Sequence, residues 1–338
     1  MMGRYDRQMR FEPFGESGQR ALREANIFVL GAGALGSASA EMLVRAGVGR
    51  LTIVDRDVLE WTNLHRQQLY TESDVERQLP KAAAAHERLT AINRDVTIEH
   101  HVVDITSENI LSLVEGHTAV LDATDNLETR LLANDACLQL GIPFFMGACV
   151  GSYGMTFPIG LREEEPCLHC LLETLPPEAA TCDTVGVISP IVVTVAAWQT
   201  AQLLRYLAGE TWQPTLQSTN LWTDEHASIR VTSLKKESCP SCSNEPVYPF
   251  LRAVHETEAS VLCGRETVQL RLPLQRAIDL QTFASIFERA GSTPVVNQHL
   301  VSGHWNDYRI VFFKDGRILV HGTNDPKKAR SLVASMTG

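Results

Sequence analysis

The residues best suited to chemistry lie in the run 54–67, which reads VDRDVLEWTNLHRQ. Asp55 ends an apolar segment, where a carboxylate can accept hydrogen bonds from ribose hydroxyls. Asn63 and Arg66 follow it by 8 and 11 residues. Hydride transfer needs no cation there, whereas adenylyl transfer must bind a triphosphate and stabilise charge at its α-phosphate. The run therefore predicts that the bound nucleotide is cleaved.

Two residues further along the chain extend this interpretation. Lys81 begins a predicted helix and can add positive charge near phosphates. Asp125 comes soon after the predicted strand 119–122, where a carboxylate could hold Mg²⁺. Each residue alone is explained as ordinary surface charge. Because four such positions fall on loops at one edge of the predicted sheet, a phosphate site is favoured.

A glycine-rich turn lies just upstream of this run. Gly31, Gly33 and Gly36 match the pattern G-x-G-x-x-G between a predicted strand and a predicted helix. Small residues let the backbone approach phosphates, which the helix N-terminus then stabilises. Asp55 follows Gly36 by 19 residues, a spacing typical of dinucleotide-binding domains. A NAD(P)-dependent oxidoreductase is therefore the main alternative.

Two C-x-x-C pairs indicate a second site. Cys167 and Cys170 form the first pair, and Cys239 and Cys242 form the second after 68 intervening residues. Four thiolates suit a structural, tetrahedral Zn²⁺ that joins distant segments. A redox pair, or two unrelated pairs, are the alternatives. We expect His169, inside the first pair, to face solvent rather than to bind the metal.

The elements that position these residues alternate along the first half of the chain. Apolar runs predict strands, and segments with helical spacing lie between them. The predicted strands are 27–31, 51–54, 96–103, 119–122 and 142–146, and the predicted helices are 35–46, 81–92 and 126–140. This order predicts an α/β fold with a doubly wound, Rossmann-like and mostly parallel sheet.

The pattern changes after Gly147. Strand-like runs at 152–161, 216–222 and 228–234 predict that the sheet continues in antiparallel strands, and an apolar helix is expected at 190–208. We expect one domain at 1–249 and a small α+β domain at 250–338. The second domain contains a predicted hairpin around Asp315-Gly316, a dipeptide that favours tight hairpin turns.

Composition limits the possible functions. The chain has 338 residues, a formal net charge of −10 and 44% hydrophobic residues, so general affinity for nucleic acid or anionic membranes is not expected. The N-terminus does not resemble a signal peptide, and no apolar run approaches the roughly 18 residues of a membrane span. We therefore expect a cytoplasmic protein. Its 8 cysteines are then expected to be metal ligands, reactive thiols or core residues rather than disulfides.

Together, these motifs resemble the bacterial E1-like adenylyltransferases of the MoeB/ThiF family, which activate ubiquitin-like sulfur carriers. The resemblance covers residues 1–244 and includes RYDRQ, GAGALG, VDRD, NLHRQ, Lys81, ATDN and both cysteine pairs. It implies that ATP binds with its ribose on Asp55 and its phosphates on Asn63, Arg66 and Lys81. It also implies that Asp125 is an essential acid linked to Mg²⁺, and that the paired cysteines bind Zn²⁺.

The resemblance implies partners as well. Arg7 is expected to reach across a homodimer interface into the ATP site of the second copy. The substrate is expected to be a ThiS-like or MoaD-like carrier, whose adenylate then reacts with a sulfur donor such as a cysteine desulfurase, for thiamine thiazole or molybdopterin synthesis. Cys182 matches a family cysteine that one branch links covalently to the carrier and the other does not require. Both possibilities stay open for this chain.

Two further alternatives belong to the same superfamily. One is a tRNA-modifying dehydratase, which the cysteine pairs and the negative net charge disfavour. The other is a carrier-docking protein without activity, which the presence of Arg66, Lys81 and Asp125 disfavours. The segment from Phe250 onward carries 11 lysines and arginines against 8 acidic residues. It is expected either to dock an acidic partner or to add stability.

Overall fold

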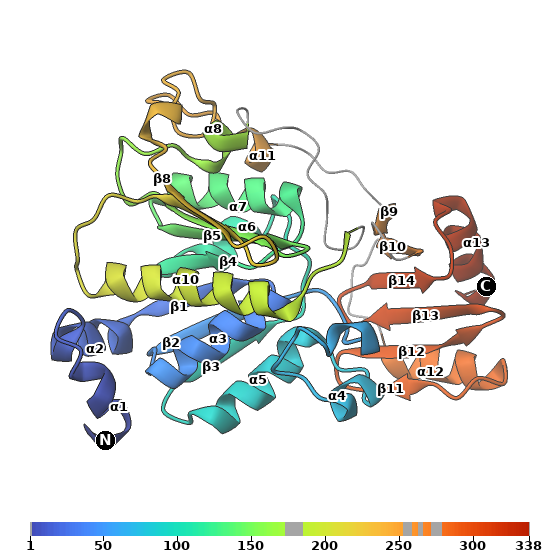
Figure 1. The fold of residues 1–338 in the computed structure, drawn as a ribbon. Coiled ribbons are helices and arrows are strands. Elements are labelled where there is room, and N and C mark those ends of the chain that lie inside the picture. The colour runs from blue at the N-terminus through green and yellow to red at the C-terminus, as the bar shows by residue number, and fades with distance from the viewer. Residues whose placement is uncertain (1, 173–184, 253–258, 263–265, 272–278, 338) are drawn as a thin grey trace. The chain divides into compact units, whose positions relative to one another are not determined.

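The computed structural model describes residues 2–172, 185–252, 259–262, 266–271 and 279–337 (Figure 1). The chain divides into two compact units, the first comprising 1–75 and 80–254 and the second 76–79 and 255–338. Each unit has its own sheet. None of the described helices combines the length and the apolar character that crossing a membrane requires.

The first unit contains an eight-stranded sheet in the order β3-β2-β1-β4-β5-β6-β7-β8. Pairing from β3 to β5 is parallel and pairing from β5 to β8 is antiparallel. The predicted α/β class with antiparallel continuation is therefore confirmed. The strands are β1 (Asn26–Leu30), β2 (Arg50–Val54), β3 (Thr97–His101), β4 (Ala119–Asp122), β5 (Phe144–Val150), β6 (Tyr153–Ile159), β7 (Leu216–Asn220) and β8 (Glu225–Ile229).

Helices lie on both faces of this sheet (Figure 1). On one face, α10 packs against α3, β5 and β6, and α5 packs against α3 and β3. On the other, α6 and α7 share an apolar core with β1, β4 and β5. These helices are α3 (Ala34–Ala46), α5 (Lys81–Ile92), α6 (Ile110–Val114), α7 (Leu127–Leu140) and α10 (Ser189–Leu207).

Short helices complete the first unit. They are α1 (Met2–Met9), α2 (Gly15–Glu24), η1 (Trp61–Asn63), α4 (Glu72–Glu76), α8 (Leu168–Leu172), η2 (Thr232–Leu234) and α11 (Pro249–Arg252).

The strand predicted at 228–234 is wrong in position. Asp224 has φ of 56° and closes the β7–β8 turn early, so β8 already ends at Ile229, opposite the start of β7. Val231 is then buried in the core instead of pairing, and η2 follows it.

The second unit has a six-stranded sheet in the order β11-β12-β13-β14-β10-β9. Its paired neighbours are all antiparallel. The predicted hairpin is present, and Gly316 in its turn has a φ of 92° that favours glycine. Helices α12 and α13 share one apolar core with alternate residues of the sheet. The elements are β9 (Ala259–Leu262), β10 (Thr267–Arg271), α12 (Leu280–Arg289), β11 (Val295–Val296), β12 (Leu300–Trp305), β13 (Tyr308–Phe313), β14 (Arg317–His321) and α13 (Pro326–Thr337).

Candidate active site and metal centre

The glycine turn joins β1 to α3, and its three glycines differ in what surrounds them. A Cβ on Gly31 would lie 2.9 Å from the carbonyl oxygen of Ala123, and one on Gly36 only 1.8 Å from that of Gly31. Both glycines are therefore required by close backbone packing. A Cβ on Gly33 would meet only the Gln67 amide nitrogen, at 3.9 Å. Gly33 thus borders open space at the N-terminus of α3, a position suited to an anion.

Asp55 follows β2 and is bound to the same turn. Its carboxylate accepts hydrogen bonds from the backbone N–H of Ala32 and from that of Asp57, both at 2.7 Å. Burial raises the pKa of Asp55, and the positive charge of Lys81 opposes that rise. Because each carboxylate oxygen has a second lone pair, both can still accept hydrogen bonds from ribose hydroxyls.

Lys81 begins α5 beneath this site. Its ammonium lies 2.9 Å from Asp57 Oδ2, and its side chain is only 4% exposed. The Tyr70 hydroxyl donates to the Ala32 carbonyl at 2.6 Å and lies 3.2 Å from the Lys81 carbonyl, which ties the glycine turn to α5. Sequence reasoning missed both Asp57 and Tyr70. The position of Asp57 two residues after Asp55 was the available signal.

The loop after β2 carries the other two predicted phosphate ligands. Asn63 is buried, and its Oδ1 accepts a hydrogen bond from the Glu60 N–H at 3.0 Å, which caps η1. Arg66 is half-buried and donates to the Thr62 carbonyl at 2.7 Å. The neighbouring Gln67, which sequence reasoning missed, is buried with its Oε1 lacking a hydrogen-bond partner in the described part of the chain. Asn63 thus shapes the loop, and Gln67 lies beside Gly33 with its amide nitrogen toward the glycine.

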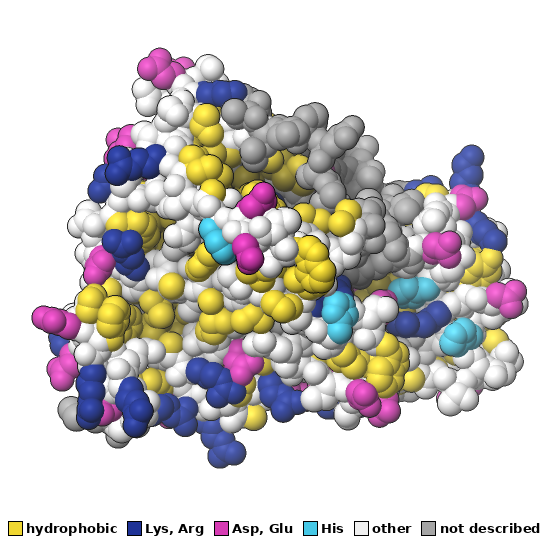
Figure 2. Space-filling view, in the orientation of Figure 1, with side chains coloured by type: hydrophobic (Ala, Val, Ile, Leu, Met, Phe, Trp, Pro, Cys, Tyr) yellow, Lys and Arg dark blue, Asp and Glu magenta, His cyan; other side chains and the backbone are white. Residues whose placement is uncertain are grey.

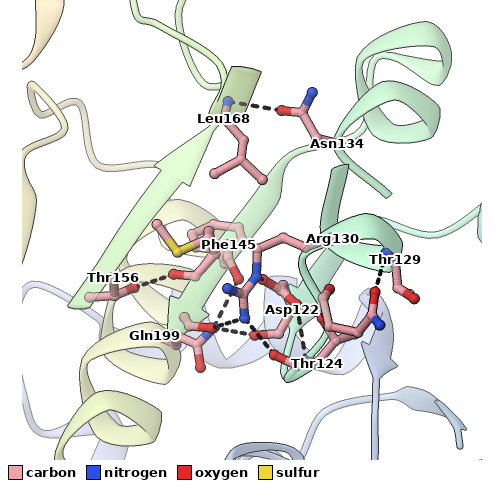
Figure 3. A network of polar contacts seen from close by, with 12 residues as sticks. Asp122, Thr124, Thr129, Arg130, Asn134, Phe145, Thr156, Leu168 and Gln199 are labelled. Carbon is pink, nitrogen blue, oxygen red and sulfur yellow. Dashed lines mark hydrogen bonds and ion pairs between the residues drawn. The ribbon is translucent and has the colours of Figure 1, made fainter. Parts of the chain in front are cut away.

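A buried polar network holds the loop that joins β4 to α7 (Figure 3). Arg130 Nε lies 2.5 Å from the carboxylate of Asp122, and its Nη2 donates to the carbonyls of Thr124 and Gly147. Gln199 of α10 donates to the carbonyls of Asp122 and Phe145 at 2.8 and 2.9 Å. Burial raises the pKa of Asp122, and the charge of Arg130 counteracts this. The network fixes both ends of the loop.

Asp125 lies in that loop and is exposed. Next to it, Asn126 caps α7 by accepting a hydrogen bond from the Thr129 N–H at 2.9 Å. The Asp125 carboxylate makes no hydrogen bond or ion pair with the residues that the structure describes. An exposed carboxylate that is not committed elsewhere, at the edge of a nucleotide site, fits the oxygen-ligand preference of Mg²⁺.

Most of the predicted nucleotide residues therefore meet at the carboxyl edge of the parallel strands. The glycine turn contacts Ala123, two residues before Asp125, and also the carboxylate of Asp55. Lys81 and the 63–67 loop adjoin the same turn. In open α/β sheets, ligands bind at this edge. Cys182 lies outside the described residues.

Arg7 is not part of this group. It is exposed on α1, which lies at the C-terminal end of α3. Gln8 donates to the Ala46 carbonyl at 3.1 Å, and Asn93 donates both to the Tyr5 hydroxyl at 2.8 Å and to the Val44 carbonyl of α3 at 2.9 Å. The glycine turn lies at the other end of α3. Since this helix has 13 residues, about 20 Å separate its two ends. An arginine side chain does not span that distance within one chain.

The four paired cysteines converge in a separate place. The Sγ atoms of Cys167 and Cys239 are 3.6 Å apart, those of Cys170 and Cys242 are also 3.6 Å apart, and all four lie within 4.8 Å of one another. Four Zn–S bonds of about 2.3 Å give a tetrahedron with edges of roughly 3.8 Å. Hydrogen bonding from the Cys167 thiol lowers the pKa of Cys242, which favours a thiolate. The cluster fits zinc.

His169 does not face solvent as expected. It is half-buried, and its Nδ1 lies 3.1 Å from the hydroxyl of Ser241 in the second pair. Its ring also packs edge-on against Phe250, with centroids 5.9 Å apart. The residues between the cysteines therefore join the two pairs to each other.

Comparison with known proteins identifies the family. Residues 5–241 match the model of the ThiF family. The chain is 51% identical over 338 residues to the sulfur carrier protein ThiS adenylyltransferase of Bacillus subtilis, covering 100% of both chains. It is 38% identical over 252 residues to the sulfur carrier protein adenylyltransferase of Thermus thermophilus, covering 72% of this chain and 92% of that one. It is 35% identical over 207 residues to the molybdopterin-synthase adenylyltransferase of Salmonella typhimurium, covering 61% of this chain and 82% of that one.

Solved structures with a similar fold include that of E. coli MccB. Its TM-score is 0.62 at 18% sequence identity, and the match covers 72% of this chain and 75% of MccB. At this identity the similarity concerns the fold alone. The family model spans the glycine turn, the Asp125 loop and most of the cysteine cluster, and the Bacillus relative matches from end to end. The chain therefore belongs to the ThiF family.

Proposed function

We propose that this protein is an ATP-dependent adenylyltransferase that activates the C-terminal carboxylate of a small ubiquitin-like sulfur carrier. The observation that carries the proposal is the end-to-end similarity, at 51% identity, to a ThiS adenylyltransferase. The relative that acts in molybdopterin synthesis is less similar and matches only 61% of this chain. A ThiS-like carrier, and thus thiazole synthesis for thiamine, is therefore the favoured substrate and pathway. The glycine turn and Asp55 would also suit the oxidoreductase alternative, but the three sequence relatives named above are adenylyltransferases.

The geometry suits the chemistry of adenylate formation. ATP would place its ribose on Asp55 and its phosphates over Gly33 at the N-terminus of α3. A carboxylate oxygen of the carrier attacks the α-phosphorus, forming a new P–O bond. The bond to the β-phosphate oxygen breaks, and pyrophosphate leaves with its electron pair. Arg66 and Lys81 stabilise the negative charge that develops on the phosphates.

Asp125 is the residue that we propose to hold Mg²⁺. The ion, when bound, neutralises phosphate charge and favours departure of pyrophosphate. The contribution of the chain is to present one exposed carboxylate from a loop that Arg130 and Asn126 hold in place. A single carboxylate supplemented by phosphate oxygens and water is a usual arrangement for this ion.

We also propose that the enzyme is a homodimer in which Arg7 completes the site of the second copy. The distance along α3 supports this, because Arg7 lies far from its own glycine turn. Helix α10 supplies a second argument: it buries Ile191 and Val195, yet its outer face is also apolar and carries exposed Ala197 and Ala201 (Figure 2). A helix that is apolar on all sides is normally covered. The adjoining α2 links α10 to α1, so a second copy on this face would receive Arg7.

The later sulfur chemistry and the metal complete the proposal. A sulfur donor would displace AMP from the carrier adenylate to give a thiocarboxylate. Cys182 is a candidate for a covalent link with the carrier at that stage, after adenylation. Zn²⁺ on Cys167, Cys170, Cys239 and Cys242 would have a structural role, since all four ligand positions are protein thiolates.

The test is exchange of radiolabelled pyrophosphate into ATP in the presence of a purified ThiS-like carrier. Exchange that depends on the carrier, together with the mass of the carrier adenylate, is the expected result. Asp125→Ala should abolish exchange, and Glu128→Ala, at an exposed position in the first turn of α7, is the matched control. Exchange that persists in Asp125→Ala would remove this residue from the mechanism. No exchange with the wild-type protein and any carrier would reject the function.

A further inference from the structure

Two neighbouring residues of α7 contact both halves of the four-cysteine cluster. Asn134 and Asp135 are both completely buried. The Asn134 Oδ1 accepts a hydrogen bond from the N–H of Leu168, which lies inside the first C-x-x-C pair, at 3.0 Å. The carboxylate of Asp135 accepts one from the hydroxyl of Ser241, which lies inside the second pair. Each pair is thus bound to α7 through a residue that is not itself a metal ligand.

These contacts form a continuous network. The Asn134 amide donates to Asp135 Oδ1 at 3.3 Å, and the N–H of Phe250 at the start of α11 donates to Asp135 Oδ2 at 3.0 Å. Ser241 also lies within hydrogen-bond distance of His169. The two pairs and α11 are therefore fixed to the same point on one helix.

The other end of α7 carries the loop proposed to bind Mg²⁺. Asn126 caps the helix, and Arg130 reaches back from its first turns to the Thr124 carbonyl, so Asp125 is held from both sides. Figure 3 shows this end together with the contact between Asn134 and Leu168. From Leu127, the first residue of α7, to Asn134 the helix rises about 10 Å. Because a hydrogen-bonded helix moves as a unit, displacement at Asn134 displaces the Asp125 loop.

We propose that Asn134 and Asp135 are positioning residues that support the metal site from outside its ligands and connect it, through α7, to Asp125. Their support of the metal site depends only on the cysteine cluster. The connection to Asp125 rests on the proposed function.

The polarity of the two residues favours this role over simple packing. A buried amide and a buried carboxylate cost free energy of desolvation, and apolar side chains of the same volume would fill the space without that cost. Here the polar atoms are bonded to groups between the cysteines and at α11. Partners of this kind orient metal ligands, and their loss typically lowers metal affinity by about 10- to 100-fold.

The first measurement is the release of zinc. The zinc-loaded full-length protein is mixed with excess chromophoric chelator, and the rate of transfer is recorded. Asp135→Asn keeps the volume and an acceptor for Phe250 but removes the carboxylate that binds Ser241 and Asn134. Asn134→Leu removes the acceptor for Leu168. We expect release to be about 10- to 100-fold faster in both variants. Gln139→Ala, on the exposed side of α7, is the control and should match wild type.

The second measurement is carrier-dependent pyrophosphate exchange by fully zinc-loaded samples. We expect kcat to fall by about tenfold or more in Asp135→Asn, since small displacements of reacting groups have effects of this size. The KM for ATP should stay near the wild-type value, because the glycine turn and Asp55 lie outside α7. Ser241→Ala, which removes only the hydroxyl that Asp135 and His169 share, is the milder variant and should speed zinc release and lower kcat by smaller factors.

The outcomes separate the parts of the proposal. Unchanged zinc release in Asp135→Asn and Asn134→Leu would overturn the support of the metal site. Faster release with wild-type kcat would overturn the connection to Asp125. Faster release in the two variants, together with a wild-type protein that shows no exchange with any carrier, would reject the proposed function and the connection while confirming the support.

Discussion

Lys81 and Asp57 form an ion pair beneath the nucleotide-binding edge, with 2.9 Å between Nζ and Oδ2. Lys81 is 4% exposed and Asp57 19%, so the ammonium is almost completely removed from water. The backbone N–H of Lys81 also donates to the Asp57 carbonyl at 2.9 Å. Asp57 therefore determines where this positive charge lies before any nucleotide binds.

This pair predicts different effects for its two partners. Asp57→Asn leaves the buried ammonium without its nearest counter-charge and should lower the free energy of unfolding by roughly 2 kcal/mol, less than for a fully buried pair because Asp55 remains close. Lys81→Met removes the counter-charge of both Asp57 and the buried Asp55, so it should also lower the free energy of unfolding by roughly 2 kcal/mol, and in addition it should abolish pyrophosphate exchange. Urea unfolding and the exchange assay check both variants. Equal stability of Asp57→Asn and wild type would contradict this account.

The glycines of the turn predict a separation of folding from binding. Gly36→Ala should destabilise the fold severely, because its Cβ would lie 1.8 Å from the Gly31 carbonyl oxygen. Gly33→Ala should fold with nearly wild-type stability, since its Cβ meets open space, yet raise the KM for ATP by about tenfold through obstruction of the phosphates. Thermal unfolding and exchange kinetics measure the two effects. A normal KM in Gly33→Ala would place the phosphates elsewhere.

The proposed dimer predicts complementation between two inactive variants. When Arg7→Ala and Asp125→Ala are mixed and allowed to exchange subunits, each mixed dimer contains one complete site if Arg7 acts across the interface. Random pairing should then restore about a quarter of wild-type exchange activity. If Arg7 acts within its own chain, no dimer contains a complete site. The absence of recovery, with subunit exchange verified independently, would therefore reject the arrangement in trans.

His117 predicts a dependence of stability on pH. Its Nε2 lies 2.9 Å from the Thr52 hydroxyl and its Nδ1 lies 3.0 Å from the Val114 carbonyl. Burial lowers its pKa in the folded protein from the ordinary 6.5. The unfolded chain therefore takes up the proton first as pH falls, so the stability present above pH 6.5 is lost progressively below it.

The test is urea unfolding of wild type and His117→Gln between pH 7.5 and pH 5.5. Glutamine does not titrate, so the advantage of wild type over the variant should shrink as the pH is lowered. The exposed His304, replaced by glutamine, is the control. A difference that stays constant over this range would show that His117 does not contribute to the pH dependence.

Several structural features could be predicted because they depend on residues close in sequence. The apolar runs that become β1, β2 and β4 and the glycine that ends α3 each follow from local patterns. The position of β8 was not predictable in this way. Residues 228–234 have suitable strand character, but the early β7–β8 turn and the burial of Val231 decide where pairing stops.

The sequence by itself determined the order of the elements, the glycine turn with Asp55, and the donor set of four cysteines, because periodicity and short motifs express local backbone preferences. Tertiary structure alone decided which distant groups meet. Packing decided the ion pair of Lys81 with Asp57, the enclosure of Asp122 by Arg130 and Gln199, and the position of Arg7 at the far end of α3. It also decided the attachment of both cysteine pairs to α7. Such contacts arise from the packing of elements far apart in the chain, where no local spacing specifies which side chains face one another.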